Sequence, residues 1–216
     1  MNVSVYRELA QRFGYRAFAQ SAALAAIGKV TEVQAFAVYL LEVGVHTDAP
    51  TGVEVRVVTA EDLERYVDEP GFELPRALLR EAIPNGDICV GAFTDGVLSA
   101  YAWYATKPAR FESGLTAECS PLYAYGYKSF TRPAARGRSL QKWIKKVSLA
   151  HHVGLGKRGI VVAVDIANHT SRRSLEGAGA KQVGQFVCWR VAGRVLSAGT
   201  SGSRRVGFRQ YETVGV

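Results

Sequence analysis

The feature that most constrains the fold is a succession of strand, glycine turn, helix and strand between residues 122 and 166. Residues 122–131 (LYAYGYKSFT) alternate in the way that is typical of a strand. Gly137 marks a turn, and Ser139 is a suitable N-cap for an amphipathic helix. The apolar run at 159–166 then predicts a buried central strand. Because a helix connects the two strands, we expect them to be parallel.

The segments on either side continue the alternation of strands and helices. Residues 53–59 alternate as a strand, and Thr59 caps a helix that begins at Ala60, followed by a second helix at 74–82. Strands at 87–94 and 97–106 flank Asp95-Gly96, the strongest short hairpin signal. A short helix from Asn168 to Gly177 or Gly179 and a strand at 182–192 complete the pattern. This order predicts an α/β or α+β fold.

The two ends of the chain differ in composition from its centre. Helical spacing at residues 5–27 and a strand at 33–43 precede the turn-rich segment 47–52, so we expect an extension at 1–50 that adds to the sheet or supports a homodimer. The main domain is expected at 53–192. A tail at 197–216, rich in Gly, Ser and Arg, is expected to be loosely ordered.

The charge and the cysteines limit the class of protein. A formal net charge of +8 favours an anionic partner without identifying it. Cys89, Cys119 and Cys188 are odd in number and widely spaced, which argues against a disulfide framework or a zinc site and predicts a reducing, cytoplasmic compartment. The most apolar early run, residues 17–27, is too short to span a bilayer.

The basic segment at 132–146 has three possible uses: a grip on nucleic acid, a solvated helix face, or a cradle for a small phosphate group. A glycine turn before a helix exposes unpaired backbone N–H groups at the positive end of the helix dipole, and these bind phosphate. Arg136 and Arg138 add charge to the turn. The turn alone does not decide between the three uses.

Two segments together resemble the signatures of the GNAT acyltransferase superfamily. The first is Arg136-Gly137-Arg138-Ser139; the second is Asn168-x-x-Ser171 after the next strand, with Gly179 eleven residues beyond the asparagine. The resemblance covers residues 53–192. It implies a mixed, largely antiparallel sheet with a parallel splay between its fourth and fifth strands, flanked by helices.

The resemblance also implies acetyl-CoA as co-substrate and no metal. Backbone groups of Phe130 and Thr131 would meet the pantetheine arm, and Asn168 with Ser171 would lie against the cofactor. The residues whose amides would cradle the pyrophosphate are Arg136, Gly137, Arg138, Ser139 and Leu140. The basic segment is then a phosphate cradle, with Lys142, Lys145 and Lys146 partly a solvated face.

The sequence departs from the family pattern at four positions. Ala134 stands in place of the first Gln or Arg, Ser139 in place of the last Gly or Ala, and Ala180 in place of the usual Phe. Leu175 occupies the place of a tyrosine that often protonates the departing thiolate, so an active enzyme needs another acid, a water, or none.

The implied reaction is direct attack of an amine on the acetyl thioester, with a backbone N–H of the fourth strand polarising the carbonyl. The candidates for the catalytic base are Tyr125 and Tyr127 on that strand and Glu118 just before it. The acceptor is expected to be an amine, on either a small molecule or a protein.

Two other functions stay open. A basic nucleic-acid or regulatory module would use Arg204, Arg205 and Arg209, with the tyrosines of 122–131 as a stacking platform, although nucleic acid is the less favoured partner. A degenerate acyltransferase would bind coenzyme A without turnover, which the leucine at position 175 motivates.

Overall fold

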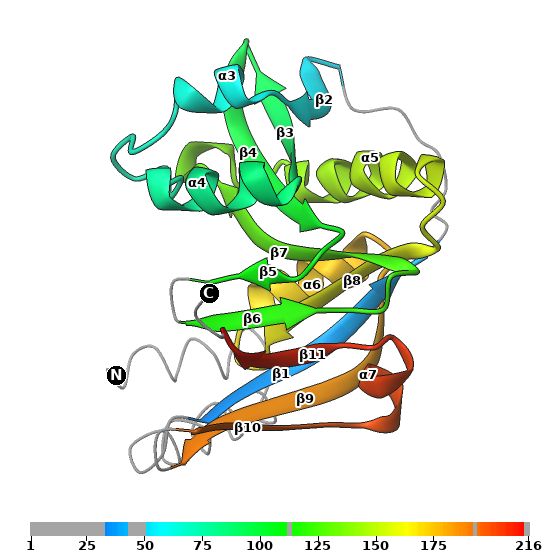
Figure 1. The fold of residues 1–216 in the computed structure, drawn as a ribbon. Helices are drawn as coiled ribbons and strands as arrows, with labels where there is room; N and C mark the ends of the chain where they lie inside the picture. Colours follow the sequence, from blue (N-terminus) through cyan, green and yellow to red (C-terminus); the bar gives the residue numbers. More distant parts are fainter. Residues whose placement is uncertain (1–32, 43–50, 112–113, 192–193, 214–216) are drawn as a thin grey trace, which may run out of the picture.

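The computed structural model describes residues 33–42, 51–111, 114–191 and 194–213, in which a three-stranded sheet packs against one of eight strands (Figure 1). The main sheet has the strand order β10 (Arg194–Gly199), β9 (Lys181–Val191), β1 (Val33–Leu41), β8 (Gly159–Asp165), β7 (Tyr123–Thr131), β4 (Val97–Ala105), β3 (Ile88–Thr94) and β2 (Val53–Val58). The small sheet has the order β11 (Arg209–Glu212), β6 (Leu115–Glu118) and β5 (Ala109–Arg110). The helices are α3 (Ala60–Glu64), α4 (Arg76–Asn85), α5 (Leu140–Gly154), α6 (His169–Gly177) and α7 (Ser201–Arg205), with a 3-10 turn at Pro133–Ala135.

The predicted parallel pair is confirmed, and it divides the main sheet. Residues 123–126 of β7 pair with residues 159–162 of β8 in parallel, whereas the other strand pairs are antiparallel. Beyond Gly126, β7 continues to pair with β4 only, and beyond Val162, β8 continues with β1 only. The two strands therefore splay apart at their carboxyl ends.

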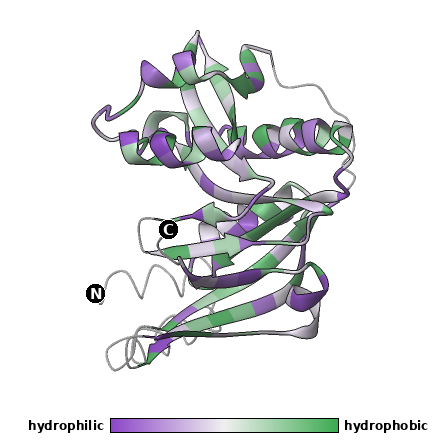
Figure 2. Cartoon of the chain, viewed as in Figure 1, coloured by the Kyte–Doolittle hydropathy of each residue, from purple (hydrophilic) through white to green (hydrophobic). Residues whose placement is uncertain are grey.

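Each face of the main sheet is covered because successive strand residues point to opposite sides. On one face, α5 and α6 bury Leu140, Ile144 and Leu175 in a cluster with alternate residues of the sheet. Figure 2 shows hydrophobic and hydrophilic residues alternating along α5, as expected for a helix with one buried stripe. The opposite face is covered by α3 and α4 over β3 and β4, and by the small sheet and α7 over β1, β8 and β9.

Local signals in the sequence explain several element boundaries. Asp95 and Gly96 adopt φ angles of 52° and 75°, which confirms the predicted two-residue hairpin. The hydroxyl of Thr59 accepts the amide of Asp62 at 3.1 Å and caps α3 as predicted. The second helix begins at Arg76 rather than at residue 74, because Pro75 is its N-cap and disfavours a helical backbone at Leu74. It extends to Asn85 and ends at the left-handed Gly86.

The strand predicted at 33–43 is present as β1 and lies inside the main sheet. It pairs with β8 on one side and with β9 on the other. Its alternating residues contribute Tyr39 to one core and Val38 to the other, and both are fully buried. Residues 33–41 are therefore part of the main sheet. The helices predicted at 5–27 lie outside the described residues, and the division of the chain into three segments stays a prediction.

The prediction of a loosely ordered tail is wrong for residues 197–213. This segment forms the second half of β10, then α7 and β11. Val206 and Phe208 are each 3% exposed, and the ring of Phe208 lies 4.9 Å from that of Phe186 and 5.6 Å from that of Tyr125. Two large apolar side chains among the Gly, Ser and Arg residues are enough to fix the segment against the sheet.

Candidate active site

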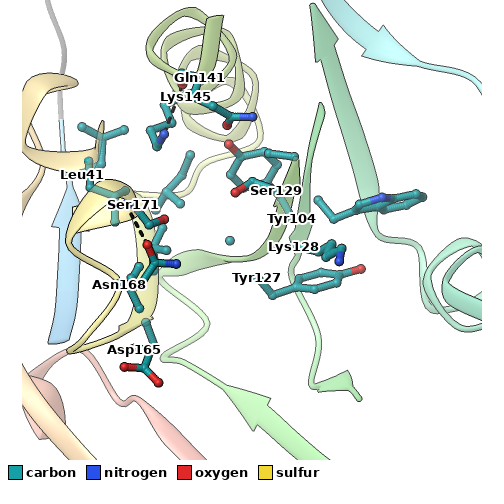
Figure 3. A pocket seen from close by; sticks show the side chains of 18 residues that line it. Leu41, Tyr104, Tyr127, Lys128, Ser129, Gln141, Lys145, Asp165, Asn168 and Ser171 are labelled. Carbon is teal, nitrogen blue, oxygen red and sulfur yellow. Dashed lines mark hydrogen bonds between the residues drawn. The ribbon is translucent and has the colours of Figure 1, made fainter. Parts of the chain in front are cut away.

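A cavity of about 240 Å³ opens where β7 and β8 splay apart (Figure 3). Its walls come from β4, β7 and β8, from α5 and α6, and from Leu41 of β1. Apolar side chains, among them Ile160, Val162 and Leu175, line part of it. The polar residues that line it are Tyr104, Tyr127, Lys128, Ser129, Gln141, Lys145, Asp165, Asn168 and Ser171. A cavity lined by both apolar and polar side chains suits a ligand that carries apolar and hydrogen-bonding groups along its length.

A β-bulge shapes the β7 wall. Ala102 of β4 pairs with Ser129, but Tyr104 pairs with Gly126, so Tyr127 and Lys128 together stand opposite Trp103. The extra residue of a bulge is left out of the ladder, and its backbone groups are available to a ligand. Lys128 and Ser129, rather than Phe130 and Thr131, line the cavity.

The structure gives Phe130 and Thr131 a different environment from the expected one. The Phe130 side chain is 8% exposed, and its carbonyl accepts a hydrogen bond from Nε2 of Gln141 at 2.9 Å. The same Nε2 contacts the carbonyl of Tyr101 at 3.1 Å and the hydroxyl of Thr131 at 3.2 Å. Gln141 therefore ties α5 to the ends of β4 and β7.

Gln141 also leaves one acceptor unused at the cavity. Among the described residues, its Oε1 atom is buried and has no hydrogen-bond partner. A buried acceptor without a partner is costly, which suggests that it is satisfied when a donor occupies the cavity. The sequence analysis missed this residue, although it directly follows Leu140 at the start of the helix.

Lys145 is the largest departure from the sequence-based expectation. It was expected on a solvated face, but it turns inward, lines the cavity, and donates from Nζ to the hydroxyl of Ser174 at 3.1 Å and the carbonyl of Gln141 at 3.3 Å. Burial lowers its pKa to about 8. In the described ranges, no carboxylate forms a salt bridge with it.

Lys142 and Lys146 each lie one residue further along the same helix, turned about 100° away from Gln141 and Lys145. Their Nζ atoms lie 5.8 and 4.7 Å from the centre of the Trp143 ring, and neither lines the cavity. One turn of helix separates Gln141 from Lys145, which places both on the inward face. The position of Lys145 follows from this helical spacing.

The turn before α5 presents backbone amides to solvent. Gly137 and Ser139 both adopt left-handed conformations, with φ angles of 81° and 57°. Within the described ranges, the amides of Gly137, Arg138 and Ser139 have no hydrogen-bond partner, whereas that of Arg136 donates to the Pro133 carbonyl at 3.2 Å. Successive exposed amides in such a turn form an anion-binding nest.

Ser139 occupies the N-cap position that was predicted for it, but it does not act as predicted. Its side chain makes no capping hydrogen bond. An N-cap residue normally has an extended backbone, and its oxygen accepts an amide of the first turn. The left-handed backbone of Ser139 leaves the amides of the first turn of α5 without that acceptor.

Asn168 and Ser171 come together at the cavity as expected. Asn168 is the N-cap of α6, and its Oδ1 accepts the amide of Ser171 at 3.0 Å (Figure 3). Both residues line the cavity. The N-terminal end of α6 thus faces the splay, opposite β7.

The three candidates for a catalytic base lie in different places. Tyr127 lines the cavity, but Tyr125 is 5% exposed and is not among the lining residues. Burial raises the pKa of Tyr125. Glu118 is part of the small sheet, where it contacts Arg209 at 3.8 Å and the hydroxyl of Tyr211 at 3.3 Å. Only Tyr127 is placed at the cavity.

A carboxylate that the sequence analysis missed is paired with Tyr127. The hydroxyl of Tyr127 donates to Oδ2 of Asp87 at 2.8 Å, and Asn85 donates to Oδ1 at 2.8 Å. Burial raises the pKa of Asp87. Asp87 follows a turn at the end of α4, and no local pattern in the sequence relates it to β7.

Cys89, Cys119 and Cys188 are free. No cluster of His, Cys, Asp and Glu side chains in the described part of the chain is arranged to hold a metal ion. Of the helices that the structure describes, none has the length and apolar character needed to cross a bilayer.

Comparison with known proteins identifies the fold. No family model and no curated protein matches the chain. A tandem GNAT protein from the clavulanic acid biosynthesis pathway aligns with a TM-score of 0.51 at 18% identity, over 84% of this chain and 59% of that one. A GCN5-related N-acetyltransferase from Sphaerobacter thermophilus aligns with a TM-score of 0.47 at 16% identity, over 79% and 56%.

A third solved structure, AAC(6')-Iy with the bisubstrate analogue CoA-S-monomethyl-acetylneamine, aligns with a TM-score of 0.47 at 18% identity, over 59% of this chain and 89% of that one. The chain spans less than two thirds of the length of the first two proteins. With its largely antiparallel sheet, its parallel β7 and β8 pair and its flanking helices, the chain has the fold of the GNAT N-acyltransferases.

Proposed function

We propose that the chain is an N-acyltransferase that moves an acetyl or related acyl group from coenzyme A to an amine, by direct attack in a ternary complex. The observation that carries this proposal is the cavity between the splayed strands β7 and β8, together with the turn before α5 beside it. A thioester with a long amide-containing arm and a pyrophosphate needs such a slot with an anion site near its mouth.

Each part of the cofactor has a matching feature in the chain. The exposed amides of Gly137, Arg138 and Ser139 are suited to the pyrophosphate, and the first turn of α5, from Leu140, extends the same positive helix end. The unpaired Oε1 of Gln141 is suited to an amide N–H of the pantetheine arm. Asn168 and Ser171 close the opposite side of the slot.

The residues at the bulge are suited to the acyl group and the amine. A backbone N–H at Lys128 or Ser129 would polarise the thioester carbonyl, since the bulge interrupts the ladder there. Asp87 would act as the base through the hydroxyl of Tyr127, which passes the proton of the amine to the carboxylate. The raised pKa of the carboxyl group suits it to accept a proton.

Tyr125 and Glu118 remain less suitable candidates for the base. Tyr125 is packed against Phe208, and Glu118 is paired with Arg209. The burial of Tyr125 also argues against the tyrosine strand as a stacking platform for nucleic acid. The acceptor is proposed to be an amine of a small molecule or a protein.

Thermal unfolding with and without acetyl-CoA tests the proposal, with duplex DNA as the control. At about 100 times its dissociation constant, a specific ligand adds about 2.7 kcal/mol, which raises the midpoint by about 5 to 11 °C for a chain of this size. We expect this shift with acetyl-CoA and none with DNA. A shift with DNA alone would favour the binding-module function instead.

Release of the coenzyme A thiol in the presence of a panel of amines then tests turnover. Release that depends on an amine supports the acyltransferase. Binding of acetyl-CoA without release for any amine, over a panel of sugar, polyamine and peptide amines, would favour the degenerate acyltransferase.

A further inference from the structure

We propose that Lys145 is the proton donor to the thiolate that leaves during acyl transfer. The proposal rests on the function proposed above and assigns the acid of that same site. It is carried by the inward position of this side chain in the cavity that Leu175 also lines, and by the lack of a carboxylate salt bridge to it from any residue that the structure describes.

The reaction requires a proton at the sulfur atom. The amine nitrogen forms a bond to the carbonyl carbon, the carbon–sulfur bond breaks, and the electron pair of that bond stays on sulfur. A thiolate beside apolar side chains such as Leu175 and withdrawn from water is poorly solvated, so a proton donor beside it lowers the barrier to its departure. Leu175 contributes no polar atom to this wall.

The other titratable groups that line the cavity are less suited to this task. Tyr104 and Tyr127 have pKa values that burial raises, which makes them weaker acids. Lys128 is paired with Glu73 at 3.3 Å. Oδ1 of Asp165 already accepts a hydrogen bond from the amide of Ala167 at 2.7 Å.

The helix packed beside Lys145 adds a hydroxyl rather than a charge. Ser174 of α6 accepts from Nζ, and the Gln141 carbonyl accepts a second proton of the ammonium group. An ammonium group has three donors, so one is left for a ligand. The titratable or charged residues of α6, none of which lines the cavity, are His169, Arg172, Arg173 and Glu176.

The acidity of Lys145 suits proton transfer to a thiolate. Burial lowers its pKa to about 8, close to that of an ordinary thiol at about 8.5. Proton transfer between groups of similar pKa has little free-energy cost in either direction. An ordinary lysine, with a pKa near 10.4, would be the weaker donor.

The protons balance over one cycle. Lys145 gives the proton of its ammonium group to sulfur, and the products are the thiol and a neutral lysine. The amine nitrogen gives up its own proton through Tyr127 to Asp87. A proton returned from Asp87 to solvent and one taken up by Lys145 from solvent restore the starting state.

Two substitutions separate proton donation from charge. Lys145→Arg keeps a cation in the cavity but removes a usable proton, because a guanidinium group does not lose its proton in proteins. Lys145→Met removes both. Lys146→Met is the matched control, since it removes a lysine of the same helix that does not line the cavity.

The test measures kcat, KM for acetyl-CoA and the pH profile of thiol release, with an amine from the panel that wild type accepts. If no amine is accepted, hydrolysis of acetyl-CoA replaces it. We expect both Lys145 variants to lose about 100-fold in kcat with little change in KM, and to lose the wild-type fall in rate above about pH 8. Lys146→Met should retain wild-type kcat.

Each other outcome overturns the proposal in a different way. Wild-type kcat in Lys145→Arg would show that only the charge matters. A raised KM with unchanged kcat in both variants would make Lys145 a binding residue. If acetyl-CoA does not stabilise the wild-type protein, the proposed acyltransferase function is wrong, and so is the role of Lys145 that rests on it.

Amine labelling gives a readout that does not depend on turnover. Acetic anhydride modifies neutral lysines, and mass spectrometry of the digested chain reports Lys145 and Lys146 separately. We expect Lys145 to be labelled with a midpoint near pH 8 and to be protected by coenzyme A, while Lys146 keeps its labelling. Labelling of Lys145 that is unaffected by bound coenzyme A would place it outside the thioester slot and overturn the proposal.

Discussion

At the scale of single residues, two kinds of position carry the site: glycine or serine in a left-handed backbone, and a lysine turned inward. The left-handed turn exposes amides because it cannot continue the hydrogen bonding of α5. Burial disfavours the charge of the lysine, which suits it to the proton transfer proposed above. Both carry a cost in stability, and that cost can be measured.

Gly137→Val should abolish binding of acetyl-CoA, since a branched side chain would cover the amides of the turn. It also introduces a left-handed valine at a φ of 81°, which costs about 1 to 2 kcal/mol. Gly156→Val is the control: its φ is 80°, it has open space around it, and it lies beyond the other end of α5. We expect equal losses of thermal stability and a loss of binding only at Gly137. Equal affinity in both variants would argue against the phosphate cradle.

Lys145→Met should stabilise the protein below about pH 8. The pKa of Lys145 is about 8 in the folded chain and 10.5 for the ordinary side chain, so the unfolded chain binds more protons between these values. The stability of wild type therefore rises with pH across this window. The variant should be more stable by about 1 to 3 kcal/mol at pH 7, and the difference should vanish near pH 10.5. Urea unfolding at several pH values checks this, and a constant difference would contradict the assigned burial of the charge.

At the scale of elements, the site depends on where helices begin. α5 and α6 both start at the splay, so their N-terminal ends face the same cavity from two sides. A capping side chain at such an end stabilises the helix, and in the proposed function it also contacts the ligand. The two roles can be separated because α3 has a cap of similar geometry outside the cavity.

Asn168→Ala should cost about 1 kcal/mol of stability and also weaken binding of acetyl-CoA. Thr59→Ala removes the matching hydrogen bond in α3, which is 3.1 Å long against 3.0 Å for the Asn168 cap. It should cost a similar amount and leave the affinity unchanged. Calorimetric titration of acetyl-CoA into both variants decides the point, and wild-type affinity in Asn168→Ala would exclude Asn168 from the site.

Elements of this chain were predictable where the signal is local. Of the residues that the motif names, Asn168 and Ser171 line the cavity, whereas Phe130 and Thr131 do not. The Asp95-Gly96 hairpin and the Thr59 cap depend on neighbours in sequence. The pairing of Tyr127 with Asp87 depends on how strands are ordered, and a single sequence does not reveal this order. Predicting the direction of the Lys145 side chain required knowing which face of the helix packs against the sheet. The many basic residues of the segment gave no sign that one lysine lies on that face.

At the scale of the whole molecule, two distant segments complete the core. β1 lies between β8 and β9 in the main sheet. The stretch from α7 to β11 covers the face of that sheet that lies opposite α5 and α6. Composition suggested that the second of these was loosely ordered, because Val206 and Phe208 are few among polar residues. The burial of these two side chains orders the segment in spite of its mostly polar composition.

Phe208→Ala should destabilise the protein by about 3 to 5 kcal/mol, since the ring is 3% exposed and packs against Phe186 and Tyr125. Leu196→Ala, at a side chain that is 47% exposed on β10, should change stability by less than about 0.5 kcal/mol. Chemical denaturation of both variants gives the comparison. Equal, small losses would show that the end of the chain does not belong to the core.

The position of β1 also determines the order of events during synthesis. Val33 pairs with Trp189 and Leu41 with Ile160, so this strand leaves the ribosome long before either of its partners has been translated. Its apolar side chains and unpaired backbone groups stay exposed to water and to other nascent chains until β8 and β9 have been translated. Sheet closure is therefore a late, long-range event, and such contacts make folding slow and dependent on protection from aggregation.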